Sequence, residues 1–172
     1  MQGKYTYEII RSIGSGGMGE VFLVHMREEK RCAAMKRVMK SETRESIREL
    51  AFAREIRMLK NLHHPGIPAY IDSFEDADAR YLVMDYIDGC TLSQSFKEKG
   101  LTPHAVKKWM RQVLYILRYL HNLQPRGVLY LDVKPQNIMM SKGKVYLIDF
   151  GSACYVDTCD FIWTATPRLC ST

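Results

Sequence analysis

The feature that most constrains the fold of this chain is a short predicted hairpin in its second half. Residues 138–140 and 145–148 have strand character and are joined across the polar turn 141–144. Because the two strands of a hairpin run in opposite directions, the residue before the first and the residue after the second lie at the same end. We therefore expect Asn137 and Asp149 to be neighbours in space.

The motifs that border this hairpin carry the functional groups of phosphoryl transfer. Asp132, Lys134 and Asn137 form the pattern D-x-K-x-x-N, and Asp149 opens the run Asp-Phe-Gly. The hairpin brings together two carboxylates, one ammonium group and one carboxamide, which are the groups that magnesium-assisted phosphoryl transfer requires. Both motifs in this order, flanked by apolar strands, are a strong signal.

A glycine-rich segment lies near the N-terminus, between predicted strands at residues 5–13 and 21–26. A dinucleotide-binding fold would follow the last glycine with a helix and an acid about 20 residues on, but here a strand follows and that region is basic. The absence of Gly-Lys-Ser/Thr excludes a Walker-type loop. An ordinary turn and a hairpin whose backbone folds over a triphosphate both remain open. The glycines are Gly14, Gly16, Gly17 and Gly19.

A buried acid is expected on the predicted helix at residues 41–62. At 100° per residue, Glu55 has apolar residues within about 60° on its side of the helix, and no basic residue occurs three or four positions away. An unpaired carboxylate in such surroundings would be costly, so its counter-ion must come from elsewhere in the fold. The alternative is a Glu55 on a solvated face of the helix.

These motifs resemble those of eukaryotic-type serine/threonine protein kinases, over essentially the whole chain, and Ala33-Ala34-Met35-Lys36 is similar to the V-A-x-K of that family. The resemblance implies ATP and Mg²⁺ as cofactors and a protein Ser or Thr as acceptor, since Lys134 favours Ser/Thr over Tyr. The resemblance implies that Asp132 is the catalytic base and that Lys134 contacts the γ-phosphate. It implies that Lys36 contacts the α- and β-phosphates and pairs with Glu55. Asn137 and Asp149 are the implied magnesium ligands.

The same resemblance implies an α+β, protein-kinase-like bilobal fold. Residues 1–87 are expected to form an N-lobe with a five-stranded antiparallel sheet and one helix, and residues 88–172 a partial helical C-lobe. The strands not yet named are at residues 31–39, 67–74 and 80–87, and the C-lobe helices at 92–99 and 104–123. Thr102 is the expected N-cap of the second of these helices, with Pro103 at its first position.

An adenine site between the lobes is also implied by the resemblance. Apolar side chains are expected around the base, and backbone groups of residues 85–87 are expected to form hydrogen bonds with it. Each apolar position is equally compatible with an ordinary place in the core. The residues concerned are Val21, Ala34, Met84, Asp85, Ile87 and Met139.

One departure from the family pattern lies beside Asp132. Tyr130-Leu131-Asp132 stands where the family has H-R-D, so the arginine that would bind an activation-loop phosphate is replaced by Leu131. Tyr130 is still expected to pack against Phe150. We expect any activity to depend less on phosphorylation of that loop.

The second departure is at the C-terminus. Residues 165–167 resemble the G-T-P that precedes the family's A-P-E, but the chain ends at Thr172 before any Pro-Glu. A truncated domain is therefore expected, in which the apolar stripe centred on Trp109 lacks its partner. Such a surface would suit a partner protein or self-association.

Composition agrees with a globular domain, at 47% hydrophobic and 26% charged residues. No apolar run approaches the roughly 20 residues of a membrane span, and no signal-type segment is present, so a cytoplasmic location is expected. Five scattered cysteines are expected to be free thiols. The net charge is +6, but acids alternate with basic residues in the 41–62 helix, so a nucleic-acid role is not expected.

Two other functions stay open. A nucleotide-binding pseudokinase or regulatory module would keep the phosphate-binding residue types and show little or no transfer. A small-molecule kinase of the aminoglycoside or choline type shares the spacing of Asp132 and Asn137, but those families usually carry His where Lys134 stands.

Overall fold

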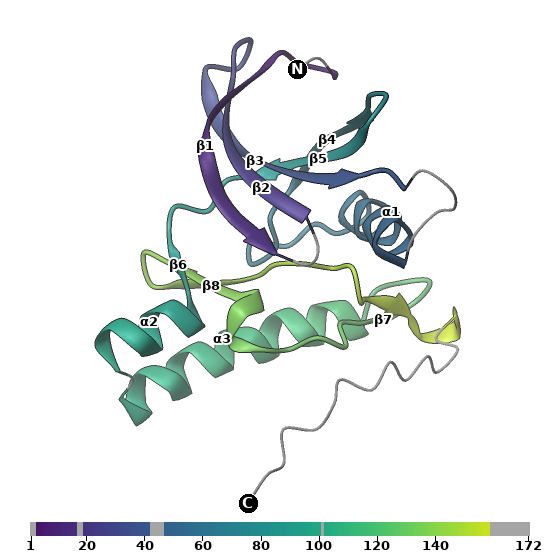
Figure 1. The fold of residues 1–172 in the computed structure, drawn as a ribbon. Helices are drawn as coiled ribbons and strands as arrows, with labels where there is room; N and C mark the ends of the chain where they lie inside the picture. The colour runs from purple at the N-terminus through teal and green to yellow at the C-terminus, as the bar shows by residue number, and fades with distance from the viewer. Residues whose placement is uncertain (1–2, 17–18, 42–46, 101, 159–172) are drawn as a thin grey trace, which may run out of the picture.

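The structure is a computed structural model of the 172-residue chain that describes residues 3–16, 19–41, 47–100 and 102–158. A strand-rich N-lobe lies above a helix-rich C-lobe (Figure 1). Gly17 and the motif at residues 165–167 lie outside the described residues. None of the helices in these ranges is long and apolar enough to cross a membrane.

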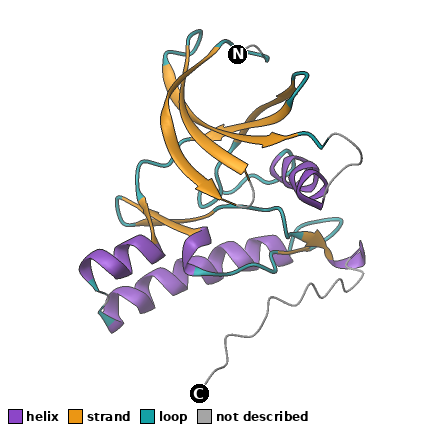
Figure 2. Cartoon of the chain, viewed as in Figure 1, coloured by secondary structure: helices purple, strands orange, loops and turns teal. Residues whose placement is uncertain are grey.

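The N-lobe is an antiparallel sheet with one helix beside it (Figure 2). The strand order is β1-β2-β3-β5-β4, and α1 (Ile47–Leu59) lies against β3 and β4. Five strands and one helix were expected, and this prediction is confirmed. The strands are β1 (Tyr7–Gly16), β2 (Gly19–Met26), β3 (Arg31–Met39), β4 (Tyr70–Glu75) and β5 (Ala79–Asp85).

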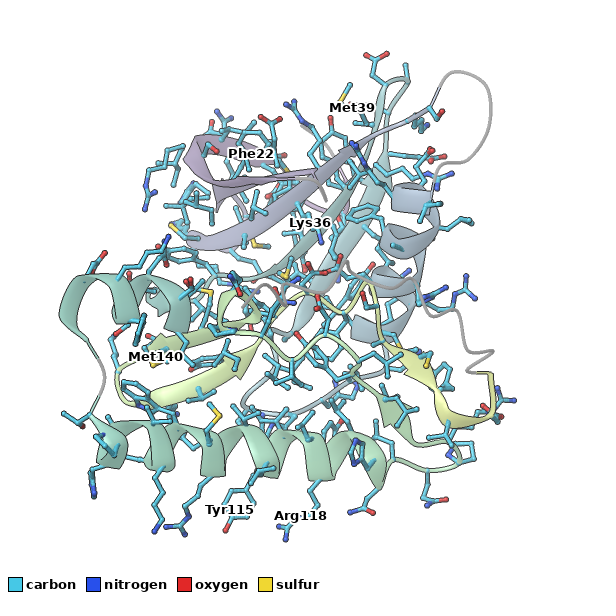
Figure 3. All side chains as sticks on the ribbon, turned by 60° about the horizontal axis from the view of Figure 1, so that its bottom comes forward. Phe22, Lys36, Met39, Tyr115, Arg118 and Met140 are labelled. Carbon is cyan, nitrogen blue, oxygen red and sulfur yellow. The ribbon has the colours of Figure 1, made fainter. Side chains whose placement is uncertain are left out.

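Strand β3 shows how the sheet sets the direction of Lys36. Successive side chains on a strand point to opposite faces. Ala33 and Met35 belong to an apolar cluster on the outer face, whereas Ala34 and Val38 belong to the main core. Lys36 is two residues from both Ala34 and Val38, so its side chain lies on the same face of the sheet. It points into the molecule, between the lobes (Figure 3).

The C-lobe is built on two capped helices. In α2 (Leu92–Lys99), Thr91 and Gln94 form a capping box in which each side chain bonds the other residue's N–H. In α3 (Pro103–His121), the Thr102 hydroxyl accepts from the Ala105 N–H at 3.2 Å, as expected. The hairpin of β8 (Ile138–Ser141) and β9 (Lys144–Leu147) packs on α3, which runs along the base of the molecule (Figure 1).

The orientation of α3 corrects one expectation. Val113, Ile116 and Leu120 are buried, and Trp109 packs partly buried against the main core, so the stripe centred on Trp109 does have a partner. The large apolar side chains that α3 exposes are instead Leu114 and Tyr115. The prediction failed because it considered only the family's later helices as the cover of this stripe, whereas β9 and the main core already cover it.

The loop between α1 and β4 joins the lobes. The Gly66 carbonyl accepts from the Leu147 N–H at 2.9 Å, and the His63 N–H donates to the Tyr119 hydroxyl at 2.8 Å. Because this backbone bonds to the C-lobe, and because Pro68 has no N–H to donate to a sheet, β4 begins at Tyr70 rather than at residue 67.

Short elements were not predicted, since two or three residues carry no period. They are β6 (Cys90–Thr91), β7 (Val128–Leu129), β10 (Cys154–Tyr155) and the 3₁₀ turns Pro135–Asn137 and Val156–Thr158. The cysteine prediction is confirmed for Cys32 and Cys90, which are free, and wrong for Cys154, which is disulfide-bonded. Scattered spacing in a sequence does not show which thiols the fold brings together.

Candidate active site

Lys36 forms a buried ion pair with Glu55 between the two lobes. Its Nζ lies 2.5 Å from Glu55 Oε2 and 3.5 Å from Asp149 Oδ1. The Lys36 and Glu55 side chains are only 9% and 2% exposed. Glu55 thus finds the counter-ion that its apolar surroundings require, and the pair ties α1 to β3.

Burial and charge oppose one another in this pair. Burial lowers the pKa of the Lys36 ammonium group, but the Glu55 and Asp149 carboxylates outweigh it and raise that pKa above its ordinary value. Burial raises the pKa of the Glu55 carboxyl, and Lys36 offsets only part of this effect. Lys36 therefore keeps its positive charge in a place where water does not screen it.

The loop between Tyr130 and Asn137 closes around Asp132. Lys134 Nζ lies 2.7 Å from Asp132 Oδ2, and Asn137 Nδ2 donates to the same oxygen at 2.8 Å. The Asp132 N–H donates to the Tyr130 carbonyl at 2.7 Å. Leu131 is therefore turned outward, 63% exposed, at a left-handed φ of 54° that is strained for a side chain with a Cβ.

The far end of the β8–β9 hairpin carries the two expected neighbours. The Ile148 N–H donates to the Asn137 carbonyl at 3.0 Å, so Asn137 and Asp149 do lie at the same end. Asp149 has a φ of 64°, again in the left-handed region, and its Oδ1 accepts from the Gly151 N–H at 3.3 Å. Two strained residues, Leu131 and Asp149, thus flank one small polar region, which is where functional sites tend to store strain.

Aromatic packing supports this region from below. The Tyr130 and Phe150 rings meet edge to face with centroids 5.1 Å apart, as expected from the sequence. The Tyr130 hydroxyl donates to the Ile148 carbonyl, and burial raises the pKa of this phenol. Tyr130 therefore fixes the backbone on both sides of the Asp132 and Asp149 motifs.

The fold requires a glycine at only one of the described positions in the β1–β2 hairpin. Gly19 has a φ of 110°, and a Cβ there would lie 2.2 Å from the Arg37 carbonyl oxygen, so only glycine fits. A Cβ on Gly16 would meet no atom within 4 Å, and one on Gly14 would make only ordinary contact with Val21. The fold therefore explains Gly19 but does not require the other two.

Comparison with known proteins gives the family. The sequence profile described as "Protein kinase domain" matches residues 7–168. This chain belongs to the protein kinase domain family. The profile covers both lobes and therefore includes the Lys36–Glu55 pair, the Asp132 loop and the Asp149 hairpin.

Relatives among curated proteins are protein kinases by name, and some of them are named serine/threonine kinases. The cAMP-dependent protein kinase type 3 of Saccharomyces cerevisiae is 32% identical over 96% of this chain and 42% of its own length. The probable serine/threonine-protein kinase YbdM of Bacillus subtilis is 31% identical, over 87% and 58% respectively. The serine/threonine-protein kinase PknD of Chlamydia trachomatis is 34% identical, over 87% and 17%. The chain thus spans less than two thirds of each of these relatives.

Within this protein kinase domain, three of the apolar residues expected at the adenine, Ala34, Met84 and Met139, lie on β3, β5 and β8. Ala34 pairs with Met84 in the sheet, and both are buried. Met139 lies on β8 between Ile138 and Met140, which both belong to the main core or pack against it. Strand alternation turns Met139 to the opposite face, so it is not simply a core residue.

Asp85, the last residue of β5, and Ile87 lie where the expected backbone contacts to the adenine would be made. The Asp85 carboxylate bonds Arg31 at 3.1 Å and the Ala69 N–H at 3.3 Å, beside a hollow of about 400 Å³ that Ile87 also lines. The Asp85 N–H donates to the Ala69 carbonyl at 3.0 Å, so this N–H is already used and is not available to an adenine. The Ile87 N–H has no backbone acceptor within the described ranges.

The donor atoms suit Mg²⁺ only when phosphate is also present. Asn137 Nδ2 is used as a donor to Asp132, which leaves the amide oxygen for a cation. One amide oxygen and the Asp149 carboxylate are a small set, and Mg²⁺ is typically completed by water and substrate phosphates. The described residues contain no group of three or more His, Cys, Asp and Glu side chains that would form an all-protein metal site.

Sequence reasoning missed two contacts of the site. Arg48 lines a small hollow together with Lys36, Glu55 and Asp149, a position that was not predicted from the sequence. The signal was its position seven residues before Glu55, which places both on one face of α1. The hydrogen bond from Asn137 to Asp132 had no sequence signal, because it depends on how the loop turns.

Proposed function

We propose that this protein kinase domain transfers the γ-phosphoryl group of ATP to the hydroxyl group of a Ser or Thr in a protein. The observation that supports it most is the Lys36 ammonium group held between Glu55 and Asp149 in the interior. Replacing a buried ion pair by apolar residues is often neutral or stabilising, so a fold alone has little need of this pair. A charged, positioned ammonium group suits the binding of phosphate.

In this proposal, the Asp132 carboxylate takes the proton of the attacking Ser or Thr hydroxyl group. The oxygen of that hydroxyl forms a bond to the γ-phosphorus of ATP, while the bond from this phosphorus to the ADP oxygen breaks. Lys134, whose Nζ lies beside Asp132, holds the transferred group. Lys36 holds the α- and β-phosphates, and Glu55 is a positioning residue for Lys36. The products are ADP and a phosphorylated protein.

The remaining assignments concern nucleotide and metal. We assign Mg²⁺ to Asn137 and Asp149, where it would neutralise charge on the phosphates. We assign the adenine to a site between residues 1–87 and residues 88–172, which we take as the N-lobe and C-lobe. Its contacts are the side chains of Val21, Ala34, Met84 and Met139 and the backbone of Asp85 and Ile87, with Gly14, Gly16, Gly17 and Gly19 over the triphosphate.

A cytoplasmic location stays a prediction of this proposal. The free thiols of Cys32 and Cys90 favour a reducing compartment, whereas the disulfide at Cys154 is unusual there. Fractionation of cells that express the chain, followed by detection in the soluble cytoplasmic fraction, is the expected result. Recovery in the secreted fraction would contradict it.

Transfer to a generic protein tests the proposal directly. The chain is expected to transfer label from radioactive ATP to casein in the presence of Mg²⁺. Asp132→Asn keeps the shape of the side chain but removes the proton acceptor, so transfer should fall by about 10²-fold or more. Asp78→Asn changes an exposed acid in the β4–β5 turn and should leave transfer unchanged.

Two outcomes separate this proposal from its alternative. Label transfer that survives Asp132→Asn would show that Asp132 is not the base and would contradict the assignment. Binding of Mg²⁺ and ATP without any transfer by the wild-type chain would instead favour the pseudokinase or regulatory module.

Leu131 leads to a second expectation within this function. Its apolar side chain is exposed at the place where the family has an arginine that binds a phosphate. Treatment of the chain with a broad protein phosphatase should therefore change its transfer rate by less than about twofold. A large loss of transfer after such treatment would show that phosphorylation acts through another residue.

A further inference from the structure

The excess positive charge of this chain is confined to one part of it. Residues 89–131 contain seven of the 25 Lys and Arg residues but only one of the 19 acids, Glu98, so they carry the whole net charge of +6. The rest of the chain is balanced. The dispersed charge that the sequence shows on α1 does not extend to this segment, most of which is α2 and α3.

Most of this charge lies on the outer face of α3. Exposed residues follow one another along the helix at intervals of three or four, so they form a single stripe. Nineteen helical residues extend over about 28 Å, and α3 lies along the base of the molecule (Figure 1). We call this stripe the basic face of α3; its residues are His104, Lys107, Lys108, Arg111, Leu114, Tyr115, Arg118 and His121.

The cations of the basic face have no acidic partners among the residues that the structure describes. Lys107, Lys108, Arg111 and Arg118 form no ion pair with a carboxylate from the described part of the chain. By contrast, the next cation along the chain, Arg126, is paired with Asp157 at 3.1 Å. Four permanent positive charges on one side of one helix repel one another weakly, and a carboxylate-bearing partner would relieve this.

Two large apolar side chains lie in the middle of these cations. Leu114 is 64% exposed and Tyr115 is 52% exposed. The Arg118 guanidinium lies 5.0 Å from the centre of the Tyr115 ring, and both side chains project away from the molecule (Figure 3). An apolar centre containing an aromatic ring, with charged residues around it, is the usual arrangement of residues in a protein interface.

We propose that the basic face of α3 docks an acidic amphipathic helix of a partner protein. Its Glu and Asp side chains would pair with Lys107, Lys108, Arg111 and Arg118, and its apolar residues would cover Leu114 and Tyr115. A helix suits this site because a straight helical stripe packs well along another helix. The proposal does not rest on the proposed function, because binding needs neither ATP nor transfer.

Other occupants fit the same face less well. A membrane-surface helix inserts its apolar face into lipid, but the apolar face of α3 is buried in the protein core. Nucleic acid would satisfy the cations through phosphates but would leave the Leu114 side chain without an apolar partner. Solvent alone would leave both the apolar pair and the unpaired cations exposed.

Fluorescence anisotropy with a designed probe tests the proposal. The probe is a labelled 18-residue peptide with Leu along one helical face and Glu elsewhere, and its control has the same composition in scrambled order. At 0.15 M salt, the wild-type chain should bind the amphipathic peptide about tenfold or more tightly than the scrambled one. Equal affinities would show attraction by charge alone and would overturn the proposal, as would no binding.

Two variants test whether the peptide binds at the basic face of α3. Lys107→Glu/Lys108→Glu/Arg111→Glu should weaken it about tenfold or more, because attraction becomes repulsion at three places. Leu114→Ala/Tyr115→Ala should weaken it less but measurably. The matched control Lys30→Glu/Arg57→Glu/Lys142→Glu reverses three exposed charges elsewhere and should bind better than the first variant.

The remaining outcomes also test whether the basic face of α3 docks an acidic helix. Circular dichroism of each variant shows whether the fold is kept, and the double alanine variant retains every charge in case the charge reversal unfolds the chain. Unchanged binding in both the charge-reversed and the alanine variants would overturn the proposal. Tighter binding to a 20-base-pair DNA duplex, or to vesicles containing phosphatidylserine, would assign the basic face to nucleic acid or to a membrane instead.

Discussion

A carboxylate in an apolar environment sets the chemistry of this chain at the scale of single residues. Glu55 is almost fully buried among Phe52, Met58 and Leu59 on α1, and Lys36 reaches it from the facing strand. Neither charge would be tolerated there alone, since an unpaired buried charge is costly. The two side chains therefore hold one another, and the ammonium group stays close to Asp149.

Removing the cation should make stability depend on pH. Lys36→Met leaves Glu55 unpaired and should lower the free energy of unfolding by about 3 kcal/mol at pH 8. Burial raises the folded-state pKa of Glu55 above its unfolded value, so stability is lost as pH rises through the interval between the two values. Urea unfolding should therefore show a smaller loss at pH 5 than at pH 8.

The double variant Lys36→Met/Glu55→Gln is the control for this effect, because it has no carboxyl left to titrate. Its loss of stability relative to the wild type should vary less between pH 5 and pH 8. An equal loss at both pH values in Lys36→Met would contradict a buried, titrating Glu55.

At the scale of elements, the loop between α1 and β4 connects the lobes through Gly66. Its carbonyl accepts from the Leu147 N–H, and a Cβ at Gly66 would lie 2.6 Å from Ile116 Cδ1 and 3.1 Å from the Val145 carbonyl oxygen. The N-lobe loop thus approaches both β9 and α3 as closely as a glycine permits. This contact fixes the sheet that carries Lys36 relative to the hairpin that carries Asp149.

Gly66→Ala should lower the free energy of unfolding by about 1–3 kcal/mol, because its methyl group overpacks the contact with Ile116. Ile116→Val removes Cδ1, the nearer of the two Ile116 atoms that the methyl would meet, and keeps Cγ1, which lies at 2.8 Å. The double variant Gly66→Ala/Ile116→Val should therefore lose less than the two single variants added together, as measured by urea unfolding. Additive losses would show that the two positions do not compete for space.

The secondary-structure elements also show which parts of the fold can be predicted from the sequence. The five N-lobe strands, α1, α2, α3 and the β8–β9 hairpin were predictable, because each has a hydrophobic period of 2 or 3.6 over several residues. The two-residue strands β6, β7 and β10 have no such period. The cover of the stripe centred on Trp109 was not predictable either, because it depends on the packing of β9, which is distant in sequence, against α3.

At the scale of the molecule, the candidate site lies where the two lobes meet. The sequence predicted that Glu55 needs a distant cation and that Asn137 and Asp149 are neighbours, since both follow from local patterns. It did not predict the left-handed backbone of Leu131 and Asp149, which depends on contacts between distant segments. The N-lobe supplies Lys36 and the C-lobe supplies Asn137 and Asp149, so nucleotide binding would require both lobes in place.

The most direct test of this account is the melting temperature with and without Mg²⁺ and ATP. A ligand at a hundredfold its Kd stabilises the folded state by about 2.7 kcal/mol, which should raise the wild-type Tm by several degrees. Each variant is compared with its own ligand-free Tm. Lys36→Met and Asp149→Ala should lose most of the shift, and the exposed control Lys30→Met should keep it. A wild-type Tm that Mg²⁺ and ATP leave unchanged, or an equal shift in all four proteins, would contradict the assignment of the nucleotide to Lys36, Glu55 and Asp149.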